Sequence, residues 1–353
     1  MLNFYPGPSK VYPEVRNYLV DAYDEGIMST PHRGDQFVQL SRDLVGLIRR
    51  RLNIPQDYHI FFTSSATECW EILIQSLTKN KSSHIYNGSF GEKWFQYAKK
   101  LRPNSEGFAF DLNSPMPVHE VQVSPDTELI CFTQNETSNG TQVTPTCILN
   151  LHNRFRDTLI AVDATSSMAG LNLKMIKADI WFASVQKCFG LPAGLAVMAC
   201  SPRTIFRAKK IAERAHYNSM VSIYEKMLNY QTTHTPNVLN LYLMKRVLED
   251  RPFIKTIDGE LTARAQDLYA FFAQFTDITL LVENEEVRSK TVLALQGSEK
   301  LVDELKKRAL SHDMRLGNGY GPWARNTFRI ANFPAILDEE YEELKRFFLH
   351  YYA

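Results

Sequence analysis

A single lysine stands between two apolar segments that are typical of buried strands. The segments cover residues 179–185 and 193–200, and Lys187 lies in the connection QKCFGLP between them. Such a lysine is commonly a buried residue whose charge is paired with other polar groups, or a residue of a surface loop. Alternatively it is a nucleophile, because burial lowers the pKa of an amine and leaves it free to form a Schiff base with a carbonyl compound. Neighbouring residues must decide between these interpretations.

A carboxylate stands at the end of the preceding apolar segment, TLIAVD. The chain between Asp163 and Lys187 is long enough for one crossover connection and one further strand, so both side chains can emerge at the same edge of a sheet. Asp163 could simply cap the turn that follows. It could also pair with the ring nitrogen of pyridoxal phosphate (PLP), a cofactor that needs an anion there to act as an electron sink.

Three further segments bring polar or aromatic side chains to predicted strand ends. In FFTSSATE, Ser64 or Ser65 could cap a helix, and the same helix start could seat a phosphate. In TQNETSNG, Asn135 and Thr137 could form a turn or donate hydrogen bonds to the phenolic oxygen of the cofactor. In NGSFGEKW, Phe90 could be a core residue or stack on a heteroaromatic ring. The convergence of these segments with the lysine favours a PLP site.

The elements that must position these residues alternate between strand and helix. Short apolar strands separated by amphipathic helices are typical of a mostly parallel sheet covered on both faces. In such sheets, ligands bind at the carboxyl ends of the strands. The sequence predicts strands at 58–63, 84–86, 129–133, 158–162 and 180–183, and helices at 66–77, 91–101 and 145–155.

The character of the chain changes after residue 200. Helical stretches dominate to about residue 275, and the sequence then predicts strands at 278–282, 291–295 and around 328–330, with helices at 301–312 and 339–352. We therefore predict a large domain at 14–250 and a smaller α+β C-terminal domain at 251–353. Residues 1–13 are too rich in proline for a helix and are expected to form an extended arm that packs with the small domain.

The composition excludes several classes of partner. The 353 residues carry a formal net charge of +1, which gives no field that would draw the chain to nucleic acid or to an anionic membrane. No apolar run approaches the roughly 20 residues of a membrane helix, and the N-terminus lacks the features of a signal peptide. The five cysteines form no CxxC pair and no metal-ligand spacing, so we expect reduced thiols, no metal site and a cytoplasmic protein.

Four segments together resemble the class V aminotransferases of fold type I. They are STPHRG, TQNETSNG, DATSSMAG and SVQKCFGLPAGLAVM, and the similarity extends from NFYPGPSKVYPEV to FRIANFPA, nearly the whole chain. The resemblance implies a PLP-dependent transferase of α/β fold, active as a homodimer on small amino acids and 2-oxo acids. It is strongest to the members that transfer the amino group of phosphoserine to 2-oxoglutarate in serine biosynthesis.

The resemblance also implies which residues hold the cofactor ring. Lys187 would bind the cofactor as a Schiff base and move a proton between the substrate Cα and the cofactor. Asp163 would pair with the pyridine nitrogen, and Thr137 would bind the ring hydroxyl. Phe90 would stack on the ring. The family usually has tryptophan at the stacking position, so Trp94 is the alternative.

The cofactor phosphate would be bound by the backbone of Ala66 and Thr67 and by Gln186. In the family, an Asn-Thr pair from the other subunit completes this site, and the segment THTP places His234 and Thr235 at those positions. The resemblance therefore implies that two subunits share each site. Thr67 departs from the family's pattern, which usually has an arginine at this position.

For the substrate, Arg329 in FRIAN matches the arginine that binds the α-carboxylate, a task that suits a bidentate guanidinium. His32 and Arg33 match the family's His-Arg pair near the substrate phosphate. A second His-Arg pair, which the family has late in the chain, is absent. The segment LGNGYGPWARN stands there instead, closer to glyoxylate-type members, and Arg315 or Arg325 could replace the missing pair.

Three other functions compete with this interpretation. One is class V transamination with alanine, serine or glyoxylate. Cysteine desulfurase activity needs a nucleophilic cysteine well beyond the lysine, and no cysteine follows Cys200. A non-catalytic PLP-fold module for binding or assembly would not need Lys187, Asp163 and Arg329 together. The sequence leaves open the choice of amino donor.

Overall fold

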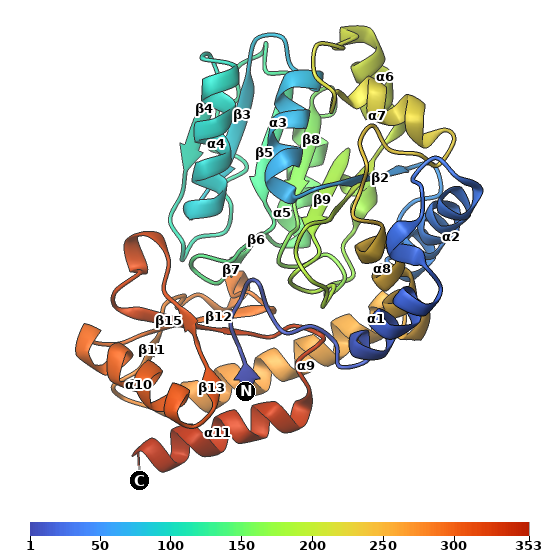
Figure 1. Cartoon of the computed structure of the whole chain (residues 1–353). Helices are drawn as coiled ribbons and strands as arrows, with labels where there is room; N and C mark the ends of the chain where they lie inside the picture. Colours follow the sequence, from blue (N-terminus) through green and yellow to red (C-terminus); the bar gives the residue numbers. More distant parts are fainter. Residues whose placement is uncertain (353) are drawn as a thin grey trace.

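The computed structural model describes residues 1–352, and its larger sheet has seven strands (Figure 1). Their order is β2 (His59–Thr63), β10 (Ala196–Cys200), β9 (Ile180–Ser184), β8 (Leu159–Asp163), β5 (Leu129–Thr133), β3 (Ser82–Tyr86) and β4 (Glu106–Ala109). β10 runs antiparallel to both of its neighbours, β2 and β9, and all other pairs of adjacent strands in this sheet are parallel. The predicted mostly parallel sheet is therefore confirmed.

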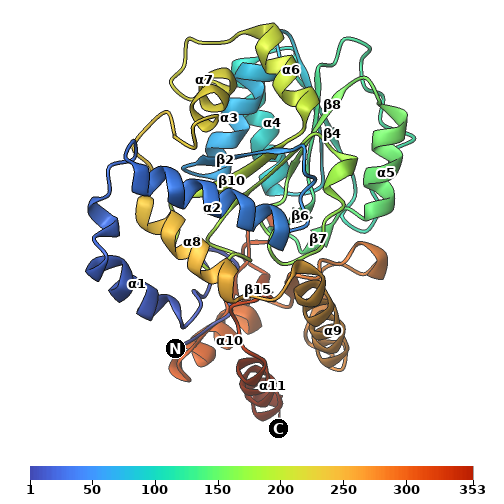
Figure 2. The ribbon, with the colours of Figure 1, turned by 90° about the vertical axis from the view of Figure 1, so that its right-hand side faces the viewer.

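Helices cover both faces of this sheet, as Figure 2 shows for α3 and α5. One face packs against α3 (Ala66–Leu77), α4 (Ser89–Leu101), α6 (Pro202–Ile211) and α7 (Met220–Met227). The other packs against α2 (Asp35–Arg51), α5 (Pro145–Arg154) and α8 (Val238–Asp250), and α1 (Val15–Asp24) lies against α8. Alternate residues of each strand enter the two cores; Ile130 and Phe132 face one and Leu129 and Cys131 the other. Burial on both faces explains why the strands are continuously apolar in sequence.

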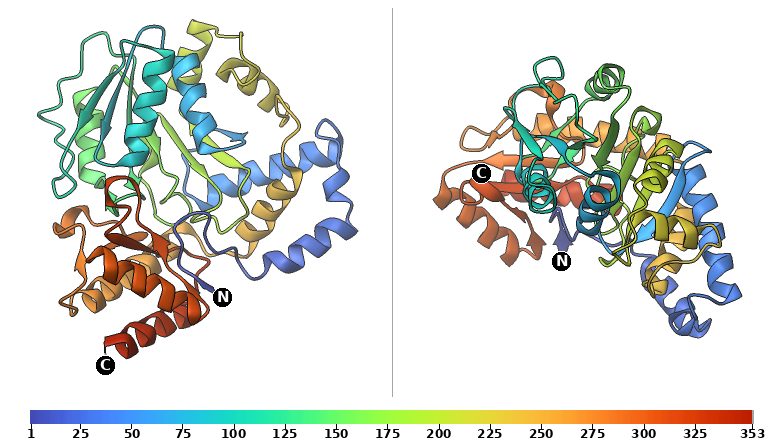
Figure 3. Two further views of the ribbon diagram at one scale, coloured as in Figure 1. Left: turned by 60° about the vertical axis from the view of Figure 1, so that its left-hand side comes forward. Right: turned by 90° about the horizontal axis from the view of Figure 1, so that it is seen from above.

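The C-terminal part builds a second, smaller sheet (Figure 3). Its antiparallel strands are ordered β11 (Thr279–Leu280), β12 (Val292–Gln296), β15 (Thr327–Ala331) and β14 (Gly317–Asn318). The helices of this part are α9 (Ile254–Phe272), α10 (Glu299–Ser311) and α11 (Asp338–Tyr352). The proposed domain division near residue 250 falls between α8 and α9.

The N-terminal residues connect the two parts of the molecule. Strand β1 (Leu2–Asn3) pairs with β13 (Met314–Arg315), and the carbonyl of Phe4 accepts a hydrogen bond from the backbone N–H of Ala331 at 2.9 Å. Farther along, the N–H of Ser9 donates to the carbonyl of Gln186 at 3.0 Å. The arm is therefore tied both to the small sheet and to the segment that carries the predicted nucleophile.

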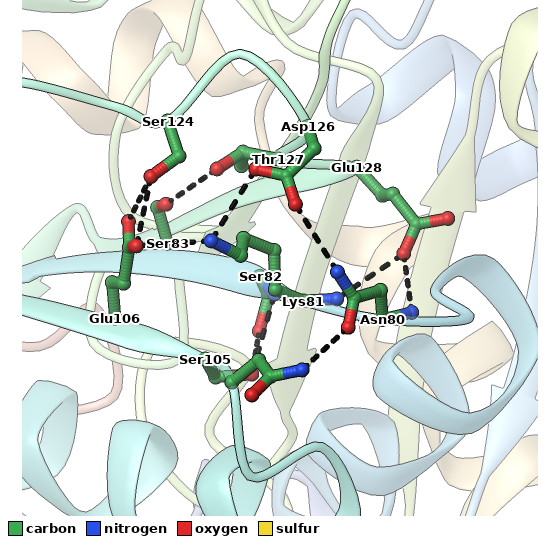
Figure 4. Close-up of polar contacts among 11 residues, drawn as sticks. Asn80, Lys81, Ser82, Ser83, Ser105, Glu106, Ser124, Asp126, Thr127 and Glu128 are labelled. Carbon is green, nitrogen blue, oxygen red and sulfur yellow. Dashed lines mark hydrogen bonds and ion pairs between the residues drawn. The ribbon is translucent and has the colours of Figure 1, made fainter.

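A cluster of polar residues stabilises the large sheet at the amino ends of its strands β3 and β5 (Figure 4). The Glu128 carboxylate accepts hydrogen bonds from the backbone N–H groups of residues 79, 80 and 81, at 2.8, 2.7 and 3.2 Å. The Lys81 ammonium pairs with Glu106 and Asp126. These residues lie at the amino ends of β3 and β5, so they secure the alignment of those strands without approaching their carboxyl ends.

Candidate active site

A cavity of about 400 Å³ opens at the carboxyl ends of β5, β8 and β9. Residues 5–8 of the arm, the starts of α3 and α4, the ends of these strands and two residues of the small domain line it. Thr133, Asp163 and Phe182 are register partners across the three strands. The side chains at the strand ends are therefore brought to one edge, as the sequence predicted.

Lys187 lies in this cavity and is only 7% exposed. Its ammonium donates hydrogen bonds to the hydroxyls of Thr137 at 2.8 Å and Ser166 at 2.9 Å, and lies 5.1 Å from the centre of the Phe90 ring. Burial lowers the pKa of the amine to about 8, although the Asp163 carboxylate opposes that change. A substantial neutral fraction is thus available near physiological pH, as a nucleophile requires.

The arm approaches Lys187 so closely that it needs a glycine. A Cβ atom on Gly7 would lie 2.9 Å from Cε of Lys187, and the residue has φ +149°. Both the contact and the backbone conformation disfavour any side chain here. The glycine of the early PGP sequence therefore lets the arm cover the lysine and restrict its access to water.

Asp163 is buried, and both of its carboxylate oxygens are engaged. Oδ2 accepts a hydrogen bond from Nε1 of Trp70 at 3.0 Å, and Oδ1 accepts one from the N–H of Thr165 at 2.9 Å. Burial raises the pKa of this carboxyl, and the hydrogen bonds and the charge of Lys187 counteract the increase. Trp70 was missing from the predicted site; its only signal in the sequence was a place on α3, one turn after Ala66.

Three buried polar atoms beside the lysine have no hydrogen-bond partner within residues 1–352. They are Oγ1 of Thr133, Nδ2 of Asn135 and Oγ1 of Thr165, and all three residues line the cavity. Buried polar groups are rarely left unsatisfied, so these atoms indicate a polar ligand. An acid to face a ring nitrogen, an aromatic ring and unsatisfied donors together fit a planar heteroaromatic group.

The start of α3 supplies a seat for a phosphate. The residues predicted for this task, Ala66, Thr67 and Gln186, all line the cavity. The backbone N–H of Ala66 donates to Oγ of Ser184 at 2.7 Å, and Ser65 caps the helix by accepting from the N–H of Glu68. The positive end of the helix dipole therefore faces the cavity, where it favours an anion.

The two candidate stacking residues lie in different environments. Phe90 lines the cavity, and its ring stacks on that of Tyr320 with centroids 5.0 Å apart. Trp94 is 1% exposed and packs edge-on against His84 and Phe182 in the core. Trp94 is therefore not a stacking residue, because it lies one helical turn further from the strand ends, where α4 packs on the sheet.

Arg329 brings a cation from the small sheet to the cavity. It is 3% exposed, and its Nη1 and Nε donate to the carbonyls of Thr137 at 2.7 Å and Asn318 at 2.6 Å. Burial lowers the pKa of the guanidinium to about 10, and the side chain forms no ion pair within residues 1–352. A fixed, uncompensated guanidinium of this kind is suited to bind a carboxylate.

The remaining predicted residues do not line the cavity of their own chain. His32 and Thr235 approach each other, with Nδ1 and Oγ1 3.4 Å apart, and Arg33 donates to Gln231 at 3.4 Å. His234 lies edge-on to the Tyr217 ring. His32 and Arg33 therefore lie close to His234 and Thr235, the pair expected to complete the site of the other subunit. The reason is that the loop before α2 packs beside the segment after α7.

Arg315 and Arg325, the proposed substitutes for the missing His-Arg pair, are also outside the cavity. Arg315 lies on β13 beside the arm, and both side chains are exposed. The third cation of the cavity is instead Lys93 on α4, a residue for which no role was predicted from the sequence. Tyr320 was missed as well. Lys93 lies in the same sequence segment as Phe90, and Tyr320 lies in LGNGYGPWARN, the segment that replaces the second His-Arg pair of the family.

Comparison with known proteins identifies the family. The sequence model described as aminotransferase class V matches residues 2–304. The chain belongs to the class V aminotransferases. The family, the fold and the aminotransferase activity predicted from the sequence are confirmed.

Individual relatives cover almost the whole chain. The phosphoserine aminotransferase of Corynebacterium glutamicum (strain R) is 29% identical over 96% of this chain and 91% of its own length. That of Rhodococcus opacus (strain B4) is 26% identical over 96% and 92%. A solved structure of a phosphoserine aminotransferase from Cytophaga hutchinsonii superposes with a TM-score of 0.95 at 32% identity, covering 99% of this chain and 98% of its own.

Proposed function

We propose that this aminotransferase uses PLP to transfer an amino group between phosphoserine and 2-oxoglutarate, as a step of serine biosynthesis. The observation that carries the proposal is the meeting of Lys187, Asp163 and Arg329 in one cavity beside three unsatisfied polar atoms. The names of the relatives at 26–32% identity support the choice of phosphoserine. Amino-group transfer from phosphoserine to 2-oxoglutarate, measured by steady-state kinetics, tests the whole assignment.

The residues that would hold PLP are those that line the cavity around the lysine. Asp163 would face the ring nitrogen, Phe90 would cover the ring, and Thr137 would bind the ring hydroxyl. Ala66, Thr67 and Gln186 would hold the phosphate. When bound, PLP supplies an electron sink for the bonds at the substrate Cα.

The chain's own residues perform the remaining work. The Lys187 amine, whose pKa burial lowers to about 8, takes up and returns the proton at the substrate Cα. Trp70 and the Thr165 N–H hold the Asp163 carboxylate in one orientation. Arg329 binds the α-carboxylate and thereby sets which bond of the Cα faces the lysine. The arm at residues 5–8 limits the entry of water.

Arg329→Lys is expected to lower kcat/KM about tenfold or more, because lysine keeps the charge and loses the bidentate fork. The loss should be similar for every amino donor, since all present an α-carboxylate. Steady-state kinetics with phosphoserine, glutamate and alanine measure it, with Arg325→Lys as the matched control. Unchanged kcat/KM in a folded Arg329→Lys variant would contradict the role.

We also propose a homodimer with shared sites. Two lines of support are the placement of His32, Arg33, His234 and Thr235 away from their own cavity and the exposed apolar side chains on the same segments. Those side chains are Met28, Tyr217 and Leu228, which are 50%, 62% and 59% exposed. A second copy that covered this surface would bury them and bring the four residues toward its own cavity.

Mixing Lys187→Ala chains with His234→Ala/Thr235→Ala chains is expected to restore activity, because one hybrid site then contains both intact halves. Activity is measured after co-refolding and compared with each variant alone. Proven heterodimers that stay inactive would count against the contribution in trans.

A cytoplasmic location is part of the proposal. All five cysteines are free and buried in the described chain, as expected for a reducing compartment. Within residues 1–352, no helix is both long enough and apolar enough to cross a membrane.

A second candidate is transamination with alanine, serine or glyoxylate. The absence of Arg315 and Arg325 from the cavity favours it, because neither of the arginines proposed to replace the missing His-Arg pair is available there to a substrate phosphate. A panel of amino donors, followed at the visible absorption band of the bound cofactor, separates the two candidates.

A further inference from the structure

The cavity contains one cation that the proposed chemistry does not use. Lys93 lines it together with Lys187 and Arg329, and Asp163 is the only acidic residue among the lining side chains of residues 1–352. Lys187 serves the proton transfer and Arg329 the α-carboxylate. The balance of charge therefore leaves one positive group for a second anion.

Lys93 is held by aromatic rings rather than by acids. It lies on α4 three residues after Phe90, and its ammonium donates a hydrogen bond to the hydroxyl of Tyr320. The ammonium is 4.8 Å from the centre of the Tyr320 ring and 5.9 Å from that of Phe90. Within residues 1–352 it forms no ion pair with a carboxylate. The aromatic rings therefore hold the ammonium in place, and no carboxylate of the described chain neutralises its charge.

The two cations available to a substrate lie against the same ring. The guanidinium carbon of Arg329 is 5.5 Å from the centre of the Tyr320 ring, against 4.8 Å for the Lys93 ammonium. Arg329 is buried, whereas Lys93 is exposed at the mouth of the cavity. An amino acid with a short side chain that ends in an anion would meet Arg329 with its α-carboxylate and Lys93 with its other end.

We propose that Lys93 binds the distal anionic group of the substrates, which is the phosphate of phosphoserine and the side-chain carboxylate of glutamate. This inference rests on the proposed function and adds the residue that selects dianionic donors over neutral ones. Tyr320 acts with it as a positioning residue, since its hydroxyl accepts the hydrogen bond from the ammonium. A merely structural lysine, which only secured Tyr320, would affect all donors alike.

The test uses the PLP-loaded enzyme and three donors: phosphoserine, glutamate and alanine. Lys93→Met is expected to lower kcat/KM about tenfold or more for phosphoserine and glutamate, mostly through KM, and to change the value for alanine less than about twofold. Lys93→Arg should retain most of the preference for phosphoserine over alanine. Lys99→Met removes an exposed lysine of the same helix that does not line the cavity, and it should leave all three values unchanged.

Equal losses for the three donors, or no loss for phosphoserine and glutamate, would overturn the role of Lys93. The wild-type enzyme alone decides the proposed function. If it accepted glutamate and not phosphoserine, the proposed function would fail, and the ratio of glutamate to alanine would still test Lys93. If it accepted only neutral donors, both proposals would fall.

Discussion

Lys187→Ala is expected to lower transamination about a thousandfold or more, because the change removes both the nucleophile and the base at the substrate Cα. Borohydride reduction of the PLP-loaded protein should also cease to attach the cofactor covalently, a result that peptide mapping reads independently of activity. The matched control is Lys174→Ala, an exposed lysine of the preceding connection, which joins β8 to β9. A reduced adduct on any other lysine of the wild-type protein would show that the assignment is wrong.

The same lysine should impose a pH dependence on that attachment. Burial lowers its pKa from 10.5 to about 8, and only the neutral amine attacks a carbonyl. The neutral fraction increases with pH, so the rate at which PLP becomes reducibly attached to the cofactor-free protein should rise as the pH passes through about 8 and then level off. A rise centred near 10 would indicate an amine in contact with water.

Much of the large sheet could be predicted because its strands are buried on both faces. The helix predicted at 66–77 coincides with α3, where an apolar run follows the cap at Ser65. The direction of β10 was not predicted, since a continuously apolar strand has the same composition in either direction. The connection from β9 to β10 forms no crossover helix, and such short connections return antiparallel.

A site residue could be predicted where the strand next to it in the sequence also determines its position in the fold. Lys187 and Asp163 meet because each ends or follows a strand of one sheet. Lys93 and Tyr320 become part of the cavity only through the contact between α4 and a loop of the small domain, and no local pattern reports that contact. His32 and Arg33 were matched to the substrate by a motif, which identifies residues without locating them, and in the fold they lie outside the cavity of their own chain.

Asp163→Asn should lower turnover about a hundredfold or more and leave the fold intact, because a neutral amide cannot hold a protonated ring nitrogen opposite it. The substitution also removes a hydrogen bond that the aspartate accepts. Both carboxylate oxygens accept hydrogen bonds, from Nε1 of Trp70 and from the N–H of Thr165, and an asparagine has only one oxygen to offer. One of the two donors would then face an amide NH2 group.

Trp70→Phe separates these two contributions. It removes one hydrogen bond, keeps the carboxylate and retains an aromatic ring in the core beside Trp94, so its loss of turnover should be clearly smaller than that of Asp163→Asn. Since the Trp70 hydrogen bond also counteracts the rise in the pKa of Asp163, the acid limb of the pH profile should move to higher pH in Trp70→Phe and not merely fall in height. Turnover, melting temperature and the pH profile of both variants measure this. Near wild-type turnover in a folded Asp163→Asn variant would exclude Asp163 as the partner of the ring nitrogen, whatever Trp70→Phe does.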